Sequence, residues 1–169
     1  MPGSAAAEMG RLINTLEVDC VLDVGAHHGG FGRVCRRLGF DGDIISFEPS
    51  TEAFEKLANR IDRTGDRRWT AHQVALGSSA GSVRLGLYEQ TQLNSVRTPD
   101  PSRSGLISAE PLAYEEVRVA PLDELWGELV RDDATVLLKI DAQGYDLEVL
   151  QGTEDFLARC AALQVEVSG

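Results

Sequence analysis

The chain has 169 residues, a formal net charge of −11 and three cysteines. This length suits a single domain over 1–169 with a substantial buried core. The negative charge is spread along the chain without an acidic tail, which argues against nucleic acid as a partner. No apolar run approaches the roughly 20 residues that a transmembrane helix needs, so we expect no membrane span.

The cysteines and histidines indicate neither disulfides nor a metal centre. Cys20, Cys35 and Cys160 are odd in number, far apart and set among apolar residues, as expected of buried thiols in a reducing compartment. We therefore expect the protein in the cytoplasm. The three histidines share no metal-ligand spacing with the cysteines or with one another, so we expect no structural metal.

Helical and strand patterns alternate along the chain. A first amphipathic helix is predicted from Ser4, its N-cap, to Glu17. The elements after it follow from apolar runs, from two-residue alternation or from three- and four-residue spacing. In chain order these are strand 21–24, helix 31–38, strand 43–48, a helix from 49 to 65, strands 69–76, 82–88 and 115–120, helix 122–130, and strands 135–141 and 162–167.

This order predicts a doubly wound α/β domain, with a Rossmann-like parallel sheet and helices on both faces. Gly39 and Gly65 are expected to end the second and third helices, and Ser50 or Thr51 to cap the third. Strands 82–88 and 115–120 are expected to pair as an antiparallel addition to the sheet. Residues 90–110 show no period and predict either a lid over a binding site or a disordered insertion.

A strand, a glycine-rich turn and a helix follow one another in VLDVGAHHGGFG, residues 21–32. Glycines in such a turn let backbone N–H groups approach a ligand closely. The dinucleotide pattern G-x-G-x-x-G is broken, because His27 occupies a position that a pyrophosphate requires to be glycine. Asp23, before Gly25, would repel a pyrophosphate but accept hydrogen bonds from a cationic ligand. The pattern D-x-G-x-x-x-G, ending at Gly29, indicates a site for S-adenosylmethionine.

A second acid follows the next strand. Glu48 ends the apolar run of 43–48, about as far beyond Gly25 as the acid that binds a ribose in nucleotide folds. A carboxylate there accepts hydrogen bonds from both ribose hydroxyls, which serves S-adenosylmethionine and NAD equally well. The alternative is that Asp23 and Glu48 only cap the helices that follow them.

Two charged residues interrupt the apolar strand TVLLKID, residues 135–141. Lys139 and Asp141 are two positions apart and therefore point to the same face of the sheet. Charges in a buried strand are costly unless they lie at its carboxyl end beside a ligand or partner, and that end of a parallel sheet is the binding crevice. We expect this pair in the active site, with a purely structural ion pair as the alternative.

With these motifs the chain resembles the FkbM-type methyltransferases, S-adenosylmethionine-dependent enzymes mostly associated with O-methylation. The resemblance runs from about Cys20 to the C-terminus. It rests on LDVGAHHGGFG, ISFEPS at 45–50, VALG at 74–77 and, most specifically, LLKIDAQGYDLEVLQG at 137–152. It implies a methyltransferase sheet of the Rossmann-like type.

The resemblance also implies roles for individual residues. Glu48 would hold the ribose of S-adenosylmethionine, and Ala75 and Leu76 would lie near the adenine. The methionine and sugar part would contact the first strand and its turn. The residues expected there are Asp23, Gly25, Ala26 and Gly29, with His27, Pro49 and Asp141 completing the binding set.

Two departures from the family pattern are visible. The family usually has K-I-D-x-E-G-x-E, whereas this chain has Gln143 and Asp146 at the acidic positions, so a carboxylate role at the first cannot be transferred. Family members also usually continue through a further strand pair, whereas this sequence stops at Gly169, just after the strand predicted over 162–167. The expectation is either that the sequence is a truncated piece or that the sheet ends early. If it is truncated, an exposed sheet edge would favour a homodimer or poor solubility.

The implied reaction is transfer of a methyl group to a hydroxyl, which requires collinear positioning and removal of a proton. Asp141 is the first candidate for accepting that proton, Lys139 would set the local field, and His28 is the second candidate base because an imidazole titrates near neutral pH. The acceptor is expected to be a small molecule or glycan, such as a sugar, a lipid-linked glycan or a polyketide. The alternatives are a non-catalytic nucleotide-binding domain and an NAD-linked oxidoreductase, which the broken glycine pattern disfavours.

Overall fold

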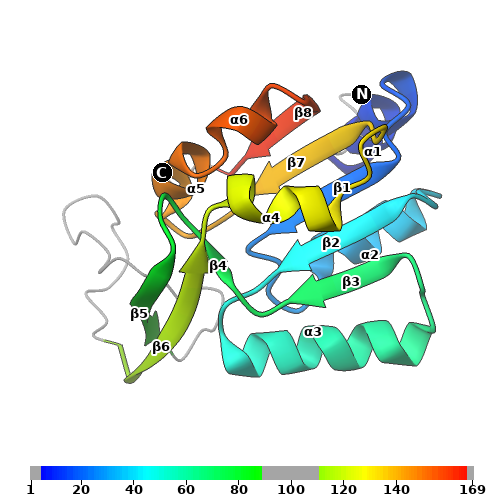
Figure 1. The fold of residues 1–169 in the computed structure, drawn as a ribbon. Coiled ribbons are helices and arrows are strands. Elements are labelled where there is room, and N and C mark those ends of the chain that lie inside the picture. Colours follow the sequence, from blue (N-terminus) through cyan, green and yellow to red (C-terminus); the bar gives the residue numbers. More distant parts are fainter. Residues whose placement is uncertain (1–4, 89–110, 167–169) are drawn as a thin grey trace.

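The computed structural model describes residues 5–88 and 111–166. Five parallel strands form the central sheet in the order β3-β2-β1-β7-β8. Their bounds are Cys20–Val24 for β1, Asp43–Phe47 for β2, Trp69–His72 for β3, Val136–Ile140 for β7 and Cys160–Val165 for β8. The chain runs outward from β1 in one direction through β2 and β3, and in the other through β7 and β8 (Figure 1).

Helices cover both faces of this sheet (Figure 1), because side chains alternate between the faces along each strand. In β1, Val21 packs with the helices of one face, whereas Leu22 and Val24 pack with those of the other. The first face carries α1 (Ala5–Thr15), α2 (Gly30–Arg37) and α3 (Thr51–Thr64); the second carries α4 (Leu122–Leu129), α5 (Asp146–Gln151) and α6 (Glu154–Leu157). The predicted doubly wound α/β fold is confirmed.

A second, smaller sheet stands beside the carboxyl ends of the central strands (Figure 1). It has the order β4-β6-β5, with β4 at Ala75–Leu76, β5 at Gly81–Leu87 and β6 at Ala113–Ala120. β5 and β6 pair antiparallel as predicted, but the prediction that they extend the central sheet was wrong. The single strand predicted over 69–76 was also wrong: after His72 the chain turns, Val74 N–H donates to the His72 carbonyl, and β3 and β4 enter different sheets.

The helix ends follow the glycine signals. Gly39 and Gly65 have φ values of 86° and 66°, a left-handed conformation that suits glycine at a helix end. Ser50 is the N-cap of α3 but makes no side-chain cap bond. The predicted cap Ser4 and the loop predicted over 90–110 lie outside the described residues.

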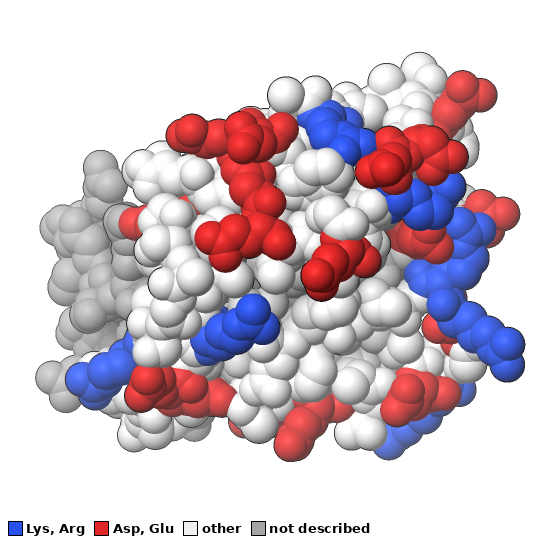
Figure 2. Space-filling model, viewed as in Figure 1, with Lys and Arg blue, Asp and Glu red and all other residues white. Residues whose placement is uncertain are grey.

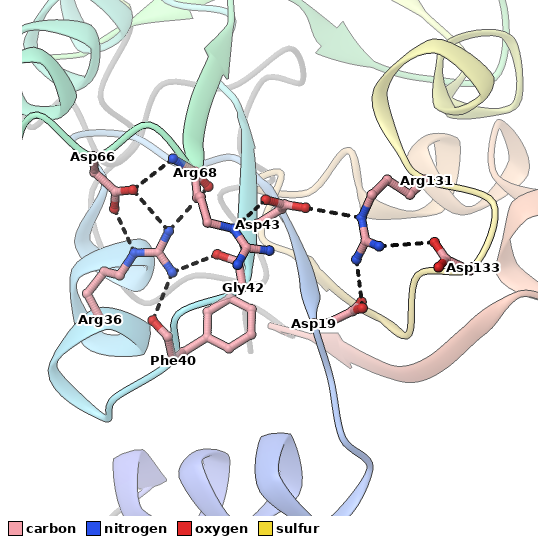
Figure 3. Close-up of polar contacts among 9 residues, drawn as sticks. All are labelled: Asp19, Arg36, Phe40, Gly42, Asp43, Asp66, Arg68, Arg131 and Asp133. Atoms are coloured by element: carbon pink, nitrogen blue, oxygen red, sulfur yellow. Dashed lines mark hydrogen bonds and ion pairs between the residues drawn. The ribbon is translucent and has the colours of Figure 1, made fainter.

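Charged side chains join the amino ends of the strands, on the edge opposite the predicted crevice (Figure 3). Arg36 bonds Asp66 at 2.7 Å and donates to the Phe40 and Gly42 carbonyls at 2.8 Å. Arg131, before β7, contacts Asp19, before β1, at 2.7 Å. These contacts connect the loops at the amino ends of the strands and involve no residue of the carboxyl edge.

Within the described ranges, no helix is both long and apolar enough to cross a membrane.

The close packing of α2 on β3 generates a stability prediction. A Cβ on Gly32 would lie 2.4 Å from the ring of Trp69, which is buried and held by a 3.0 Å hydrogen bond from its Nε1–H to Ser46 Oγ. Gly32→Ala is therefore expected to lower the free energy of unfolding by about 1–3 kcal/mol. Urea denaturation followed by circular dichroism measures it.

Gly30→Ala is the matched control, since it lies in the same helix and its Cβ would meet nothing within 4 Å. That substitution is expected to be neutral or to stabilise by about 0.5–1 kcal/mol. Equal effects of the two substitutions would contradict the packing explanation.

Candidate functional site

A pocket of about 400 Å³ opens at the carboxyl edge of the central sheet. It lies at the ends of the neighbouring strands β1 and β7, from which the strand order proceeds in opposite directions. Open α/β folds bind ligands at this position. Its size is within the range of small-molecule sites. The walls come from the ends of β1, β2, β7 and β8 and from the small sheet.

The glycine turn after β1 forms one wall. Gly25 has a φ of 74°, and a Cβ there would lie 1.8 Å from the carbonyl oxygen of Asp141. The N–H groups of Gly25 and Ala26 both donate to the Phe47 carbonyl at 3.0 Å. Only glycine fits at the first of these positions, because the ends of β1, β2 and β7 meet there.

Glu48 faces the pocket from the end of β2 and is held by two backbone donors. His27 N–H donates to its Oε2 at 2.8 Å and Ser50 N–H to its Oε1 at 3.0 Å. The residue is only 7% exposed, and burial raises the pKa of its carboxyl to about 7, against the opposing effect of the two N–H bonds. A carboxylate offers about four acceptor positions, so Glu48 can accept further hydrogen bonds from a ligand.

Below the pocket, Lys139 forms a buried ion pair with Asp23. Its Nζ lies 3.0 Å from Asp23 Oδ1 and 3.9 Å from Asp141 Oδ2. Asp23 is fully buried; burial raises the pKa of its carboxyl, and the Lys139 cation opposes that shift. The structure therefore corrects the expected pairing, because Asp23 and Lys139 are register partners on adjacent strands and the contact to Asp141 is the longer one.

Asp141 lines the pocket just after β7, as do Gln164 of β8 and Glu166 directly after β8. Its Oδ1 accepts a 2.6 Å hydrogen bond from Gln143 Nε2. Asp141 raises the pKa of the Glu166 carboxyl, first through its negative charge and then by accepting a hydrogen bond from the protonated form of Glu166. Gln164 lines the same wall, and its Oε1 is buried without a hydrogen bond among the described residues.

The pocket also contains residues that sequence reasoning missed. Glu166 could have been found with the rule that found Glu48, because β8 is parallel to β7 and its carboxyl end must reach the same edge. Because the strand was predicted to run to residue 167, Glu166 was placed inside the strand and was not identified as an acid at its end. Other lining residues were not predicted because packing between distant segments brings them to the pocket; they include Phe31, Leu85, Tyr145 and Gln164.

Most of the expected binding residues line the pocket, but three do not. Lining residues are Gly25, Ala26, His27, Glu48, Pro49, Ala75, Leu76, Lys139 and Asp141. Asp23 lies beneath the surface, and Gly29 faces Leu57 and Trp69, which a Cβ would meet at 2.7 and 3.0 Å. His28 lies in a different hollow, so the geometry does not support it as the base.

His27 is present in the pocket as a neutral imidazole. Burial, followed by the positive charges of His28 and Lys56, lowers the pKa of His27 to about 4. Its side chain is therefore uncharged at neutral pH. Among the residues that the structure describes, no group of three or more histidines, cysteines and acids is arranged to hold a metal.

The parallel sheet, the pocket at its carboxyl edge and the acid held at the end of β2 define a Rossmann-like α/β domain with a pocket of small-molecule size. The chain belongs to the methyltransferase FkbM domain family, whose model matches residues 23–169.

Individual relatives agree with this family. The chain is 27% identical over 145 residues to Methyltransferase 1 of Beauveria bassiana, covering 80% of this chain and 58% of the relative. It is 25% identical over 157 residues to the hexuronic acid methyltransferase AglP of Haloferax volcanii, covering 92% and 59%. The chain thus spans less than two thirds of either relative.

Solved structures share the fold. A methyltransferase FkbM from Methylobacillus flagellatus superimposes with a TM-score of 0.60 at 18% identity, over 88% of this chain and 32% of that one. An rRNA methylase from Streptococcus thermophilus gives a TM-score of 0.52 at 9% identity, over 98% and 73%. At such identities the likeness concerns the fold alone.

The buried pair generates a prediction that a double-mutant cycle tests. Lys139→Met leaves the Asp23 charge buried without a partner, so it is expected to lower the free energy of unfolding by about 3–5 kcal/mol. Adding Asp23→Asn removes the stranded charge and is expected to restore much of this loss. Urea unfolding of both single variants and the double variant measures the coupling.

Lys56→Met is the control, because Lys56 is half exposed and pairs with Glu52 on the same helix. Its effect is expected to stay below about 1 kcal/mol. Additive effects of Lys139→Met and Asp23→Asn would show that the pair does not matter for stability.

Proposed function

We propose that this domain is an S-adenosylmethionine-dependent methyltransferase that methylates a hydroxyl group of a sugar, a glycolipid or a polyketide-type small molecule. The observation that carries this proposal is the Glu48 carboxylate, which both His27 N–H and Ser50 N–H hold at the end of β2, facing the pocket. A carboxylate fixed in this way is suited to accept hydrogen bonds from the two vicinal hydroxyls of a ribose.

The rest of the pocket suits the other parts of this cofactor. Ala75 and Leu76 with Leu85 of the small sheet form an apolar wall for the adenine. Gly25, Ala26 and His27 of the glycine turn line the pocket as well. The buried Oε1 of Gln164, which has no hydrogen bond in the described part of the chain, is an acceptor for an ammonium group.

Charge also favours a cationic ligand over a phosphate in this pocket. Asp141, Glu166 and Glu48 line it, whereas Lys139 is its only lining lysine or arginine in the described ranges and is already paired with Asp23. Such a lining would repel a pyrophosphate and attract a sulfonium or ammonium. This argues against the NAD alternative.

When bound, S-adenosylmethionine supplies an electrophilic methyl carbon on a sulfonium. The residues of the chain must position the acceptor hydroxyl and take its proton. Asp141 is assigned this role, because its carboxyl lies in the pocket beside Lys139 and Glu166. Asp23 is assigned a positioning role, since it reaches the pocket only through Lys139.

A sugar hydroxyl is the acceptor that the comparisons favour most. The Haloferax volcanii relative is named a hexuronic acid methyltransferase. The polar side chains of Gln143, Gln164 and Tyr145 line the pocket together with Asp141, and their amide and hydroxyl groups can form hydrogen bonds with a polyol.

Isothermal titration with S-adenosylhomocysteine tests cofactor binding. The wild type is expected to bind it and not NAD, and Glu48→Ala is expected to weaken binding about tenfold or more, as loss of a charge-assisted hydrogen bond of about 1.5–3 kcal/mol requires. Glu55→Ala, an exposed acid on α3 outside the pocket, is expected to bind normally. Binding of NAD alone, or equal affinities of all three proteins, would refute the proposed site.

A second experiment tests the role of Asp141. With an acceptor selected from hydroxylated sugars by transfer of a labelled methyl group, Asp141→Asn is expected to lower kcat by about 10²–10⁴-fold. Its affinity for S-adenosylhomocysteine is expected to change little, because the amide keeps the shape of the side chain. Parallel losses of affinity and kcat would instead make Asp141 a cofactor ligand.

A further inference from the structure

A second hollow, of about 370 Å³, lies between the glycine turn and α3. It shares no lining residue with that pocket. One of its residues, His28, comes from the turn, and the others come from α3. The α3 residues are Lys56, Asn59, Arg60, Arg63 and Thr64.

The α3 residues recur at the three- and four-residue spacing that places side chains on one helix face. Three of them are cations and none is an acid. Lys56 pairs with Glu52 at 2.5 Å, whereas neither Arg60 nor Arg63 makes an ion pair within residues 5–88 and 111–166. Like charges at this spacing repel one another, and they stand around one hollow in a chain of net charge −11.

His28 adds a polar atom that also lacks a partner. Its Nε2 is buried and makes no hydrogen bond among the described residues, and its ring stacks on that of His27 with the centroids 3.6 Å apart. Burial, then Lys56 and Arg60, lower the pKa of His28, while Glu52 opposes them. A buried polar nitrogen without a partner is unfavourable unless a ligand supplies one.

We propose that this hollow binds a phosphate group, either on a small organic molecule or as free phosphate. Guanidinium groups match phosphate oxygens with paired hydrogen bonds, and a doubly charged phosphate balances the cations better than a single carboxylate does. The His28 imidazole supplies a further donor to an oxygen. The site is independent of the proposed methyl transfer, because it uses none of the residues assigned to it.

The surface elsewhere favours a small ligand over a polyanion. Acidic side chains spread over the face that carries α4 and α6 (Figure 2), including Asp123 and Glu124 in the first turn of α4 and Glu154 and Asp155 in that of α6. A long polyanion would meet repulsion from such surfaces. A single phosphate group needs only the hollow itself.

The test is a titration of the purified chain with inorganic phosphate, followed by the imidazole NMR signals of the histidines at constant ionic strength. The His28 signal, assigned with His28→Gln, is expected to shift and to saturate, while the signal of His72 stays in place. Arg60→Gln and Arg63→Gln are each expected to weaken binding about tenfold. Arg37→Gln removes the same charge from the exposed end of α2 and is expected to leave the affinity unchanged.

The source of the phosphate is tested with glucose 1-phosphate, and the anion class with glucuronate. Tighter binding of glucose 1-phosphate than of inorganic phosphate would identify an organic phosphate as the ligand, and the reverse order would identify free phosphate; both support the site. Three outcomes would overturn the proposal. They are a shift that never saturates, equal weakening by Arg37→Gln and Arg60→Gln, and glucuronate binding as tightly as phosphate.

Discussion

The architecture of the pocket depends on the buried ion pair between Lys139 and Asp23. These residues are register partners on β7 and β1. These two neighbouring central strands are the ones from which the strand order proceeds in opposite directions. Two charges removed from water are unfavourable unless they pair with each other, and Lys139 Nζ lies 3.0 Å from Asp23 Oδ1. The pair therefore holds the strand ends at the position where the pocket opens, and it places the Lys139 ammonium beneath the carboxyl of Asp141.

Above that pair, backbone geometry and acidic side chains shape the pocket together. Gly25 lets the ends of β1 and β7 approach until no Cβ fits between them. The turn that follows supplies the His27 N–H group that holds Glu48. The glycine turn thus packs against the end of β7 and also orients the Glu48 carboxylate. Substitutions in the turn therefore affect both the fold and the site.

The small sheet is attached to the central domain beside the same pocket. Glu115 of β6 accepts hydrogen bonds from the backbone N–H and the hydroxyl of Thr51, at the first residue of α3. A carboxylate at this helix end also interacts favourably with the helix dipole. This contact holds the small sheet near Glu48, and the sheet in turn supplies Leu85 to the pocket wall. The small sheet therefore adds apolar residues to a pocket whose acids follow the strands of the central sheet.

Local signals were sufficient for much of this description. The strand, glycine turn and helix over 21–38, the acid Glu48 at a strand end and the alternation of strands and helices are confirmed, because backbone conformation and side-chain period depend on neighbours in the chain. From these signals the doubly wound fold and the edge of the sheet that carries the pocket were predicted. Most residues expected to bind a ligand indeed line it.

Contacts between segments distant in the sequence were decided only by the tertiary structure. The period of a strand tells which face a side chain occupies but not which residue lies opposite, so Asp141 was expected where Asp23 is the closer partner of Lys139. For the same reason, sequence alone could not divide 69–76 between two sheets, place Glu166 beside Asp141 or turn His28 toward α3. The sequence by itself determined the elements and the strand-end acids; register and packing decided which of their side chains meet, because those depend on the whole assembled core.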